Sequence, residues 1–472
     1  GTRIACSSPA CCCVASAFAH SSNWLQRVFP VKSTALACYT MLTMAPVALS
    51  AAEKSPLAEY VQRPDDAFRW VKRRGGKIGA SDYVELTLTS QKWKGTLWKH
   101  QLFIIKPSSV KPKNKHALLV IEGGNWHPRL AGAVGEDDNL PGEAPLFASI
   151  AEQLGTPVAV LLQVPHQPIF KGKVEDQAIA YTFAQFMLTG DDQWPLLLPM
   201  TKSAVRGMDA VQQFCKRDWG LDLDNFTVTG ASKRGWTTWL TGAVDPRATA
   251  IAPMVIDMLN LAPQMKHQVE VWGDYSEMID DYTELGLQKH LDTEQGLALR
   301  SIVDPYSYRE QLKVPKLIML GTNDAYWPVD ALNLYWDELA GENYILYVPN
   351  NGHSLRDIGR MVGSVNALHQ HTNGGPKLPK LKWQFEETEE SLTLTVTSSI
   401  KPQRVQVWVA TSDTRDFRRS RFTSRDAALE DGAYTYTLAK PKTGHAVLFG
   451  EAVFDGEPLS YYLSTNVRVV SP

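Results

Sequence analysis

Cysteine is scarce in most of this 472-residue sequence. Five of the six cysteines fall within the first 38 residues, and Cys215 is the one that follows. A region with a single cysteine cannot form an internal disulfide, so burial of apolar side chains must stabilise it. Cys215 shares the apolar side of an expected helix with Ala204, Met208 and Val211, which favours a buried and unreactive thiol.

Two further shortages exclude classes of partner. Lysine and arginine (48) do not outnumber aspartate and glutamate (50), and the net charge is -2. This balance argues against nucleic acid as a partner, because phosphate binding requires a basic excess. Beyond residue 52 no run of about 18 apolar residues occurs, so the sequence predicts no membrane span.

Signatures of a bound metal or cofactor are missing as well. After residue 52 the sequence has no cysteine pair, and its histidines are scattered rather than spaced as ligands. It also has no glycine-rich loop of the Walker or dinucleotide-binding kind. We therefore expect neither a metal nor a cofactor.

The first 52 residues differ from the rest of the chain. Lys32 is followed by a mildly apolar run at 34–47 and by small residues at 48–52, which is typical of a secretory signal peptide. The residues before Val31 read as an overextended reading frame or as the disordered tail of a fragment. We predict that residues 1–52 are a leader and that the protein is exported, to the periplasm or outside the cell.

Short apolar runs recur through the middle of the chain, and helical patterns separate them. These runs cover residues 117–121, 158–162, 226–229, 248–256, 316–320 and 344–348. Strands that are buried on both faces have this composition, and their alternation with helices predicts a doubly wound, mostly parallel sheet. Two alternating runs before them, 83–89 and 96–105, read as paired strands. Residues 60–75 and 330–339 read as helices.

Two segments depart from this α/β pattern. Residues 260–312 are long, polar and aromatic, which predicts a helical cap inserted into the α/β domain. After a turn-forming stretch at 372–379, short runs with a period of two predict a small all-β domain, most simply a sandwich. We divide the chain after the leader into an α/β domain over 53–375, which includes the cap, and a β-sandwich domain over 381–472.

A strand, a sharp turn and a helix follow one another in residues 225–240. The turn is Gly230-Ala231-Ser232. A serine on such a turn exposes its hydroxyl above the sheet, and the backbone N–H of the next residue, Lys233, faces the same reacting centre. Ser232 is therefore the candidate nucleophile.

Two more residues complete the set that acyl transfer by serine requires. Asp324 follows the predicted strand at 316–320, and His353 follows the one at 344–348. The order serine, aspartate, histidine at three strand ends is that of the α/β-hydrolase fold. Each residue alone is common in turns or cores, but their joint placement predicts a catalytic triad.

A second residue could serve as the acid of the triad, and the positions of two chain segments predict the oxyanion donors. Asp257 comes directly after the run at 248–256, from where it could orient the histidine instead. The backbone N–H of Lys233 is expected to bind the oxyanion together with that of Gly124 or Asn125, which follow an early strand. Glycine in this loop lets the backbone approach a substrate closely.

The turn departs from the common hydrolase sequence Gly-x-Ser-x-Gly. Arg234 stands where a small residue is usual, and the glycine comes one place later, at Gly235. The segment is similar to the Gly-x-Ser-Arg-x-Gly of carbohydrate esterases that act on glucuronate esters, with Lys233 in the place of their arginine. Two roles stay open for the basic residues: a cation that supports the oxyanion, or solvated residues of the first helical turn.

Aromatic and histidine side chains near the strand ends are candidates for the walls of a substrate pocket. They are Trp126, His127, His166, Trp236, Tyr326 and Trp327. Packing in a core or lid is the commoner role of such residues, and the sequence alone leaves both roles open.

Five longer stretches carry a family resemblance. They are Glu122-Gly-Gly-Asn125, Leu162-Gln-Val-Pro165 with Gln167-Pro168, Trp194-Pro-Leu-Leu-Leu-Pro-Met-Thr-Lys-Ser203, Gly230-Ala-Ser-Lys-Arg-Gly-Trp236 and Gly321-Thr-Asn-Asp324. With them the chain resembles the PhoPQ-activated pathogenicity-related family from about residue 57 to near the C-terminus. The resemblance implies an exported α/β-hydrolase-like protein with a small β domain, and it puts Ser232, Asp324 and His353 at the family's triad.

We predict an exported serine hydrolase that cleaves an ester or peptide bond of a small-molecule or peptide substrate. Peptide, lipid and carbohydrate esters all stay open as substrates. The alternative is a secreted signalling or binding protein of the autocrine proliferation repressor type, in which the hydrolase fold is inactive or incidental.

Overall fold

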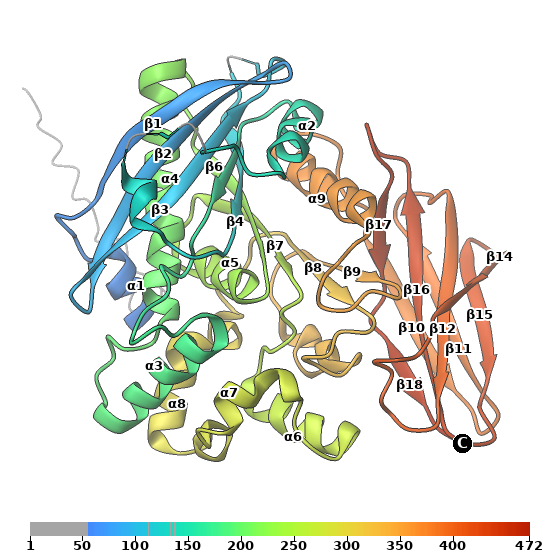
Figure 1. The fold of residues 1–472 in the computed structure, drawn as a ribbon. Helices are drawn as coiled ribbons and strands as arrows, with labels where there is room; N and C mark the ends of the chain where they lie inside the picture. Colours follow the sequence, from blue (N-terminus) through green and yellow to red (C-terminus); the bar gives the residue numbers. More distant parts are fainter. Residues whose placement is uncertain (1–54, 112, 133, 136–137) are drawn as a thin grey trace, which may run out of the picture. The chain divides into compact units, whose positions relative to one another are not determined.

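A mixed sheet of fourteen strands runs through the part of the chain that the computed structural model describes, residues 55–111, 113–132, 134–135 and 138–472 (Figure 1). The predicted leader lies outside these described residues. The first nine strands of the sheet lie in the order β1-β2-β3-β5-β4-β6-β7-β8-β9. Their bounds are β1 Arg69–Ile78, β2 Ser81–Trp93, β3 Thr96–Lys106, β4 His116–Ile121, β5 Val158–Leu161, β6 Asn225–Ala231, β7 Ala248–Met254, β8 Lys316–Gly321 and β9 Asn343–Val348.

The pairing of these strands confirms the predicted doubly wound sheet. Strands β1, β2, β3 and β5 pair antiparallel in turn, and every pair from β5 to β9 is parallel. Because parallel strands end at the same edge of a sheet, the segments that follow β4, β6, β8 and β9 meet there. These four segments carry, in the same order, the candidate oxyanion loop, the candidate nucleophile, the candidate acid and the candidate base.

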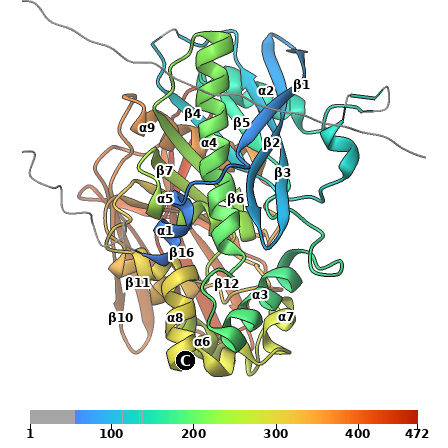
Figure 2. The ribbon, with the colours of Figure 1, turned by 90° about the vertical axis from the view of Figure 1, so that its left-hand side faces the viewer.

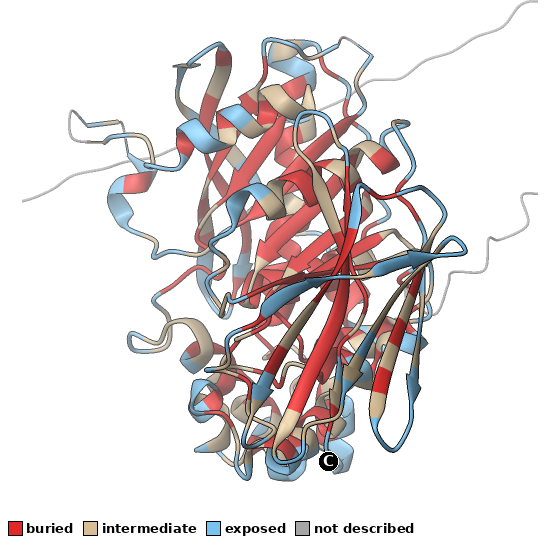
Figure 3. Cartoon of the chain, turned by 90° about the vertical axis from the view of Figure 1, so that its right-hand side faces the viewer, coloured by how far each residue is buried: buried red, intermediate tan, exposed pale blue. Residues whose placement is uncertain are grey.

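Helices cover both faces of the sheet, so the central strands are largely buried (Figures 1–3). One face carries α4 (Leu197–Trp219) and α5 (Lys233–Val244), and the other carries α2 (Ala144–Leu154) and α9 (Ile358–Thr372). On β4, Ala117, Leu119 and Ile121 pack toward the first face, and Leu118 and Val120 toward the second. This division explains the unbroken apolar run of that strand.

Cys215 lies on α4 and is fully buried, as its apolar neighbours predicted. Burial raises the pKa of its thiol to about 12, so the thiol stays protonated at neutral pH. The residue therefore acts as a small apolar side chain of the core.

The segment at 260–312 is helical, in agreement with the predicted cap. It consists of short helices and 3₁₀ turns: α6 Leu261–Trp272, η3 Glu277–Ile279, α7 Asp280–Thr283, η4 Leu287–His290, α8 Glu294–Val303 and η5 Pro305–Tyr308. Helix α3 (Glu175–Thr189) packs against α7 and α8. The cap thus meets the helix that follows β5.

Two expected helices are wrong. Residues 60–75 contain the end of α1 (Pro56–Gln62) and the start of β1, and residues 330–339 form two separate 3₁₀ turns, η6 (Ala331–Leu334) and η7 (Trp336–Glu338). The charged residues of β1 suggested a solvated helix, but the side chains of Arg73 and Arg74 point into the protein.

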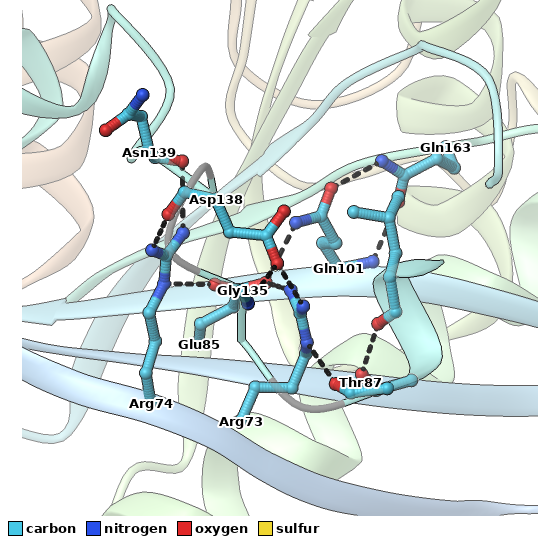
Figure 4. Close-up of polar contacts among 11 residues, drawn as sticks. Arg73, Arg74, Glu85, Thr87, Gln101, Gly135, Asp138, Asn139 and Gln163 are labelled. Carbon is cyan, nitrogen blue, oxygen red and sulfur yellow. Dashed lines mark hydrogen bonds and ion pairs between the residues drawn. The ribbon is translucent and has the colours of Figure 1, made fainter. Parts of the chain in front are cut away.

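A buried carboxylate explains two of the basic residues of β1 (Figure 4). Glu85 on β2 is fully buried, and its carboxylate accepts hydrogen bonds from Arg73 and from Nε of Arg74 (2.5 Å). Arg73 also pairs with Asp138 (3.0 Å), in the chain segment after β4. Gln101 of β3 donates to the same carboxylate (2.8 Å). The charges of Arg73 and Arg74 are therefore neutralised inside the fold, as buried charges must be.

The C-terminal strands form an all-β unit, as predicted. A four-stranded sheet has the order β10-β11-β15-β14, and the remaining strands extend the large sheet beyond β9 in the order β17-β16-β12-β13, with β18 beside β16. Their bounds are β10 Leu381–Glu387, β11 Ser391–Ser398, β12 Arg404–Ser412, β13 Thr423–Asp426, β14 Ala428–Glu430, β15 Ala433–Ala439, β16 His445–Phe454, β17 Tyr461–Ser464 and β18 Arg468–Val470. Alternate residues of β11 share one core with β12 and β16. We refer to residues 381–472 as the β unit.

The β unit and the α/β part share a sheet through a single pair of residues. Ser464 of β17 is antiparallel to Ile345 of β9, and the Ser464 hydroxyl accepts a hydrogen bond from the N–H of Tyr347 (3.0 Å). The extension of the α/β sheet into the β unit could not be read from period-two patterns, because those patterns fix the face of a strand but not its partner.

Candidate active site

The turn at Ser232 is strained and tightly packed. Ser232 has φ 57° and ψ −124° between the end of β6 and the start of α5. This conformation is unfavourable for a residue with a side chain and is found mainly where function requires it. A Cβ on Gly230 would lie 2.8 Å from Cβ of Arg234, and one on Gly235 would lie 2.7 Å from the Met254 carbonyl oxygen. Both glycines therefore permit the close approach of strand and helix.

Ser232, His353 and Asp324 are brought into one hydrogen-bonded chain. Nδ1 of His353 lies 2.9 Å from Oδ2 of Asp324. Since a carboxylate oxygen accepts, Nδ1 is the donor of this hydrogen bond. Nε2 is then the acceptor for the Ser232 hydroxyl (2.8 Å). The N–H of Tyr326 donates to the other carboxylate oxygen of Asp324 (2.9 Å), which fixes the orientation of the acid.

The alternative acid has a different partner. Asp257 is buried, and its carboxyl accepts a hydrogen bond from the Tyr335 hydroxyl (2.7 Å). Burial raises the pKa of Asp257 to about 8. The negative charge of nearby Asp324 also raises this pKa, whereas the hydrogen bond from Tyr335 lowers it. Asp257 is thus mainly protonated at neutral pH, which suits it poorly to stabilising a histidinium.

Lys233 is buried beside the candidate nucleophile and paired with an acid that the sequence did not reveal. Its ammonium lies 2.5 Å from Oδ2 of Asp176, at the start of α3. The Tyr282 hydroxyl of the cap donates to the other oxygen of Asp176 (2.9 Å). Burial alone would lower the pKa of Lys233, but the attraction of Asp176 outweighs it, so the pKa is raised. Lys233 is a neutralised cation.

Tyr326 connects this ion pair to the histidine. Its hydroxyl lies 3.3 Å from both Nζ of Lys233 and Oδ2 of Asp176. Its ring lies against the imidazole of His353, with centroids 4.2 Å apart and planes at 31°. Tyr326 therefore restrains the imidazole ring as well as the carboxylate of the acid.

Arg234 is also buried, and it ties the turn to the candidate oxyanion loop. Its guanidinium forms a bidentate pair with Glu175 (2.7 and 2.5 Å), and Nε donates to the Val164 carbonyl oxygen (2.7 Å). A side chain on Gly123 would collide with this guanidinium. Lys233 and Arg234 are 8 % and 9 % exposed, so the hypothesis that they are solvated residues of the first turn is wrong.

Hydrogen bonds hold the loop after β4 on both sides of Gly124 and Asn125. The carbonyl oxygen of Gly123 accepts from the N–H of Gln163 (2.8 Å), and the N–H of Trp126 donates to the Gln167 carbonyl oxygen (2.7 Å). The Gln163 side chain in turn exchanges hydrogen bonds with Gln101, which links the loop to the Glu85 cluster (Figure 4). Gly124 has φ +100°, a value that requires glycine.

Lys233 is the first residue of helix α5. The first N–H groups of a helix have no acceptor within the helix, so the N–H of Lys233 is available to a substrate. The contact between Arg234 and Gly123 joins the first turn of this helix to the loop that carries Gly124 and Asn125. The candidate oxyanion donors therefore belong to two segments that pack directly on each other.

A cavity of about 90 Å³ borders Ser232 and His353; we call it the inner cavity. Three of the aromatic residues predicted for a pocket, Trp236, Tyr326 and Trp327, contribute to its walls. The rest of the wall is mostly aliphatic and comes largely from the cap. The inner cavity is thus a nearly apolar chamber whose wall includes the serine and the histidine.

The other three predicted pocket residues lie along the chain segments after β4 and β5. Trp126 and His166 pack on each other with ring centroids 5.7 Å apart, and Nδ1 of His166 is bonded to the backbone of Lys99. His127 precedes the 3₁₀ turn η2 (Pro128–Ala131). Packing is the role that the structure gives to Trp126 and His166.

Among the described residues, no three histidine, cysteine, aspartate or glutamate side chains are grouped so that they could hold a metal ion. Within the same residues, every helix is too short or too polar to cross a bilayer.

The strand order and the turn at Ser232 define an α/β-hydrolase fold. The chain belongs to the PhoPQ-activated pathogenicity-related protein family, whose model matches residues 57–418, and the resemblance of its motifs is thereby confirmed. It is 32% identical over 440 residues to autocrine proliferation repressor protein A of Dictyostelium discoideum, an alignment that covers 85% of this chain and 86% of that protein.

Solved structures with related folds are far more distant in sequence. An acetyl xylan esterase from Paenibacillus sp. R4 is 15% identical with a TM-score of 0.43, covering 64% of this chain and 87% of its own. An S-formylglutathione hydrolase from Agrobacterium tumefaciens is 11% identical with a TM-score of 0.40, covering 64% of this chain and 96% of its own.

Proposed function

We propose that this protein is a serine hydrolase that cleaves an ester or peptide bond through an acyl-enzyme on Ser232. One observation carries the proposal: the unbroken chain from Asp324 through His353 to the Ser232 hydroxyl, with both contacts at hydrogen-bond length. The strained backbone of Ser232 adds support, since strain of this kind is characteristic of nucleophile turns.

The reaction follows from these roles. Oγ of Ser232 attacks the carbonyl carbon of the substrate while its proton passes to Nε2 of His353. The tetrahedral intermediate then breaks its bond to the leaving group, which takes that proton and departs as an alcohol or amine. Water attacks the acyl carbon in the same way, and a carboxylic acid leaves as Oγ recovers its proton. Asp324 stabilises the histidinium in both halves of the reaction.

The oxyanion of each intermediate requires preorganised donors. The N–H of Lys233 and that of Gly124 or Asn125 are the candidates. The ammonium of Lys233 adds little net charge because Asp176 neutralises it. We assign the Lys233–Asp176 pair to holding the site together rather than to binding an anionic substrate.

Export of the enzyme is part of the proposal. Its support is the signal-peptide pattern of the predicted leader, which the described residues do not include. Secretion of the tagged full-length chain into the periplasm or medium is the expected result, and retention of that chain in the cytoplasm would contradict it.

A signalling or binding role is the second candidate, favoured by the name of the relative from Dictyostelium discoideum. The two candidates differ in whether Ser232 reacts. A fluorophosphonate probe is expected to label the folded wild-type protein and to leave Ser232→Ala unlabelled. Folded wild-type protein that takes up no label would overturn the hydrolase proposal in favour of the second candidate.

The identity of the acid is tested by a matched pair of substitutions. Asp324→Asn is expected to lower kcat by about 10⁴-fold, because the histidine loses its orienting acceptor. Asp257→Asn keeps an acceptor for Tyr335 and is expected to retain most of the activity. The opposite ranking would make Asp257 the acid.

A further inference from the structure

We infer that the site accepts esters with a short acyl group and a larger apolar alcohol, an inference that rests on the proposed acyl-enzyme at Ser232. Two largely apolar cavities of unequal size both border the histidine. Their sizes, and the position of the serine on one of them, decide which part of the substrate each one holds.

The inner cavity is the smaller of the two, about 90 Å³. A cavity of about 150 Å³ is sufficient for a benzene molecule, so the inner cavity holds only about four heavy atoms. Leu299 of α8 and Met265 of α6 form part of its cap-side wall, and both are buried. The wall is mostly apolar, and the Lys233–Asp176 ion pair on it is already neutral, so a charged acyl group has no free counter-ion there.

The second cavity is a crevice of about 440 Å³ between α2 and α9, over the face of the sheet. We call it the α2–α9 crevice. Its walls include Phe147 and Ile150 of α2 and Met361 and Val365 of α9. His353 and Val255 border this crevice as well as the inner cavity, so the two cavities approach each other at the histidine.

The chemistry assigns one part of the ester to each cavity. The acyl carbon becomes bonded to Oγ of Ser232, and Ser232 lines the inner cavity. The leaving oxygen receives its proton from Nε2 of His353, and that histidine lines the crevice together with Leu355 and Ala231. The acyl chain therefore occupies the inner cavity, and the alcohol extends into the α2–α9 crevice.

A pair of isomeric esters tests this arrangement directly. Octyl acetate and ethyl octanoate have the same formula and differ in which side of the ester carries the long chain. We expect kcat/KM of the full-length protein for octyl acetate to exceed that for ethyl octanoate at least tenfold. Equal values, or a preference for ethyl octanoate, would overturn the inference.

Substitutions in each cavity give independent readouts. Leu299→Ala enlarges the inner cavity and should raise the kcat/KM ratio of ethyl hexanoate to ethyl acetate at least fivefold. Leu297→Ala, on the same helix but 54 % exposed, should leave that ratio unchanged. Ile150→Trp fills the crevice and should lower kcat/KM for octyl acetate at least fivefold relative to methyl acetate. Unchanged ratios in both cavity variants would count against the assignment.

Labelling separates failure of this inference from failure of the proposed function. A wild-type protein that reacts with the fluorophosphonate probe at Ser232 but prefers ethyl octanoate refutes the inference alone. A folded protein that neither reacts with the probe nor hydrolyses any of these esters refutes the proposed function, and the inference falls with it.

Discussion

The β unit contacts both loops that carry the proposed acid and base, and we predict that these contacts position them. The side-chain amide of Asn323, next to Asp324, donates to the carbonyl oxygens of Phe417 (3.1 Å) and Ser420 (2.8 Å) in the β unit. Asn350, three residues before His353, exchanges two hydrogen bonds with the backbone of Phe422 (3.0 and 2.8 Å). The N–H of Asn323 also donates to the Asn351 carbonyl oxygen (2.9 Å), so the two loops hold each other.

Asn323→Ala removes the donor and leaves backbone carbonyls of the β unit without this partner. Each lost hydrogen bond costs about 1 kcal/mol, and a carbonyl left without a partner adds to that, so we expect a loss of about 1–3 kcal/mol in the free energy of unfolding. The effect on the reaction should be larger than the effect on binding. A displacement of about 1 Å between Asp324 and the histidine can cost about 10²-fold in rate.

The assay is steady-state hydrolysis of octyl acetate together with urea unfolding. Asn323→Ala and Asn350→Ala should each lower kcat by about 10–100-fold with KM nearly unchanged, since the asparagines do not line the cavities. Asn333→Ala is the matched control. Asn333 also bonds the β unit, by donating to the Val467 carbonyl oxygen (3.0 Å) from η6, but it does not adjoin the acid or the base.

Two results would refute this reasoning. One is an Asn323→Ala variant that loses stability but keeps the wild-type kcat, which would make the contact structural only. The other is an Asn333→Ala variant that loses as much kcat as Asn323→Ala, which would mean that any loosening of the β unit impairs the enzyme.

Three further predictions concern buried charges. The pKa of Asp257 is about 8 in the folded state against 3.8 for the free side chain, so its contribution to stability is present below about pH 3.8 and is lost as the pH rises toward 8. Asp257→Asn should therefore raise Tm relative to wild type more at pH 8 than at pH 4.5, and parallel pH profiles of Tm would contradict this. Glu85→Gln leaves the arginines of β1 without their carboxylate and should lower the free energy of unfolding by about 3 kcal/mol in urea titrations; a change below about 0.5 kcal/mol would contradict it. Arg234→Met and Glu175→Gln should each destabilise the protein, and the double variant should be more stable than the sum of the two effects by at least about 1 kcal/mol; additive values would show that the pair is not coupled.

The order of the central strands and the meeting of Ser232, Asp324 and His353 were predictable because local patterns determine them. A strand buried on both faces is a continuous apolar run, and Ser232, Asp324 and His353 each follow such a run. Parallel strands then bring their following residues to one edge without any information about distant contacts. The pattern therefore predicted which residues meet, and the structure brings them within hydrogen-bond distance of one another.

The partners of the basic residues were not predictable in the same way. Asp176 lies 57 positions before Lys233, and nothing in the local sequence of either residue indicates the pair. The same holds for Arg73 and Glu85, where the closely spaced charged residues of β1 imitate a solvated helix. Salt bridges between distant segments leave no periodicity, so a cation near a catalytic serine cannot be assigned a role until its counter-ion is known.

The counter-ion of Arg234 also explains why the turn tolerates a bulky residue where most hydrolases have a small one. A small residue two places after the serine usually lets the helix pack against neighbouring segments, and a guanidinium there requires space and a counter-charge. Gly123 supplies the space, and Glu175 supplies the charge. The motifs around Gly123, Val164 and Ser232 are thus one physical unit, in which Arg234 fixes the candidate oxyanion loop to the turn of the candidate nucleophile. The unusual turn accommodates its bulky residue because the guanidinium forms a bidentate ion pair with Glu175, and in the proposed reaction we expect Arg234 to act only through the position of the loop.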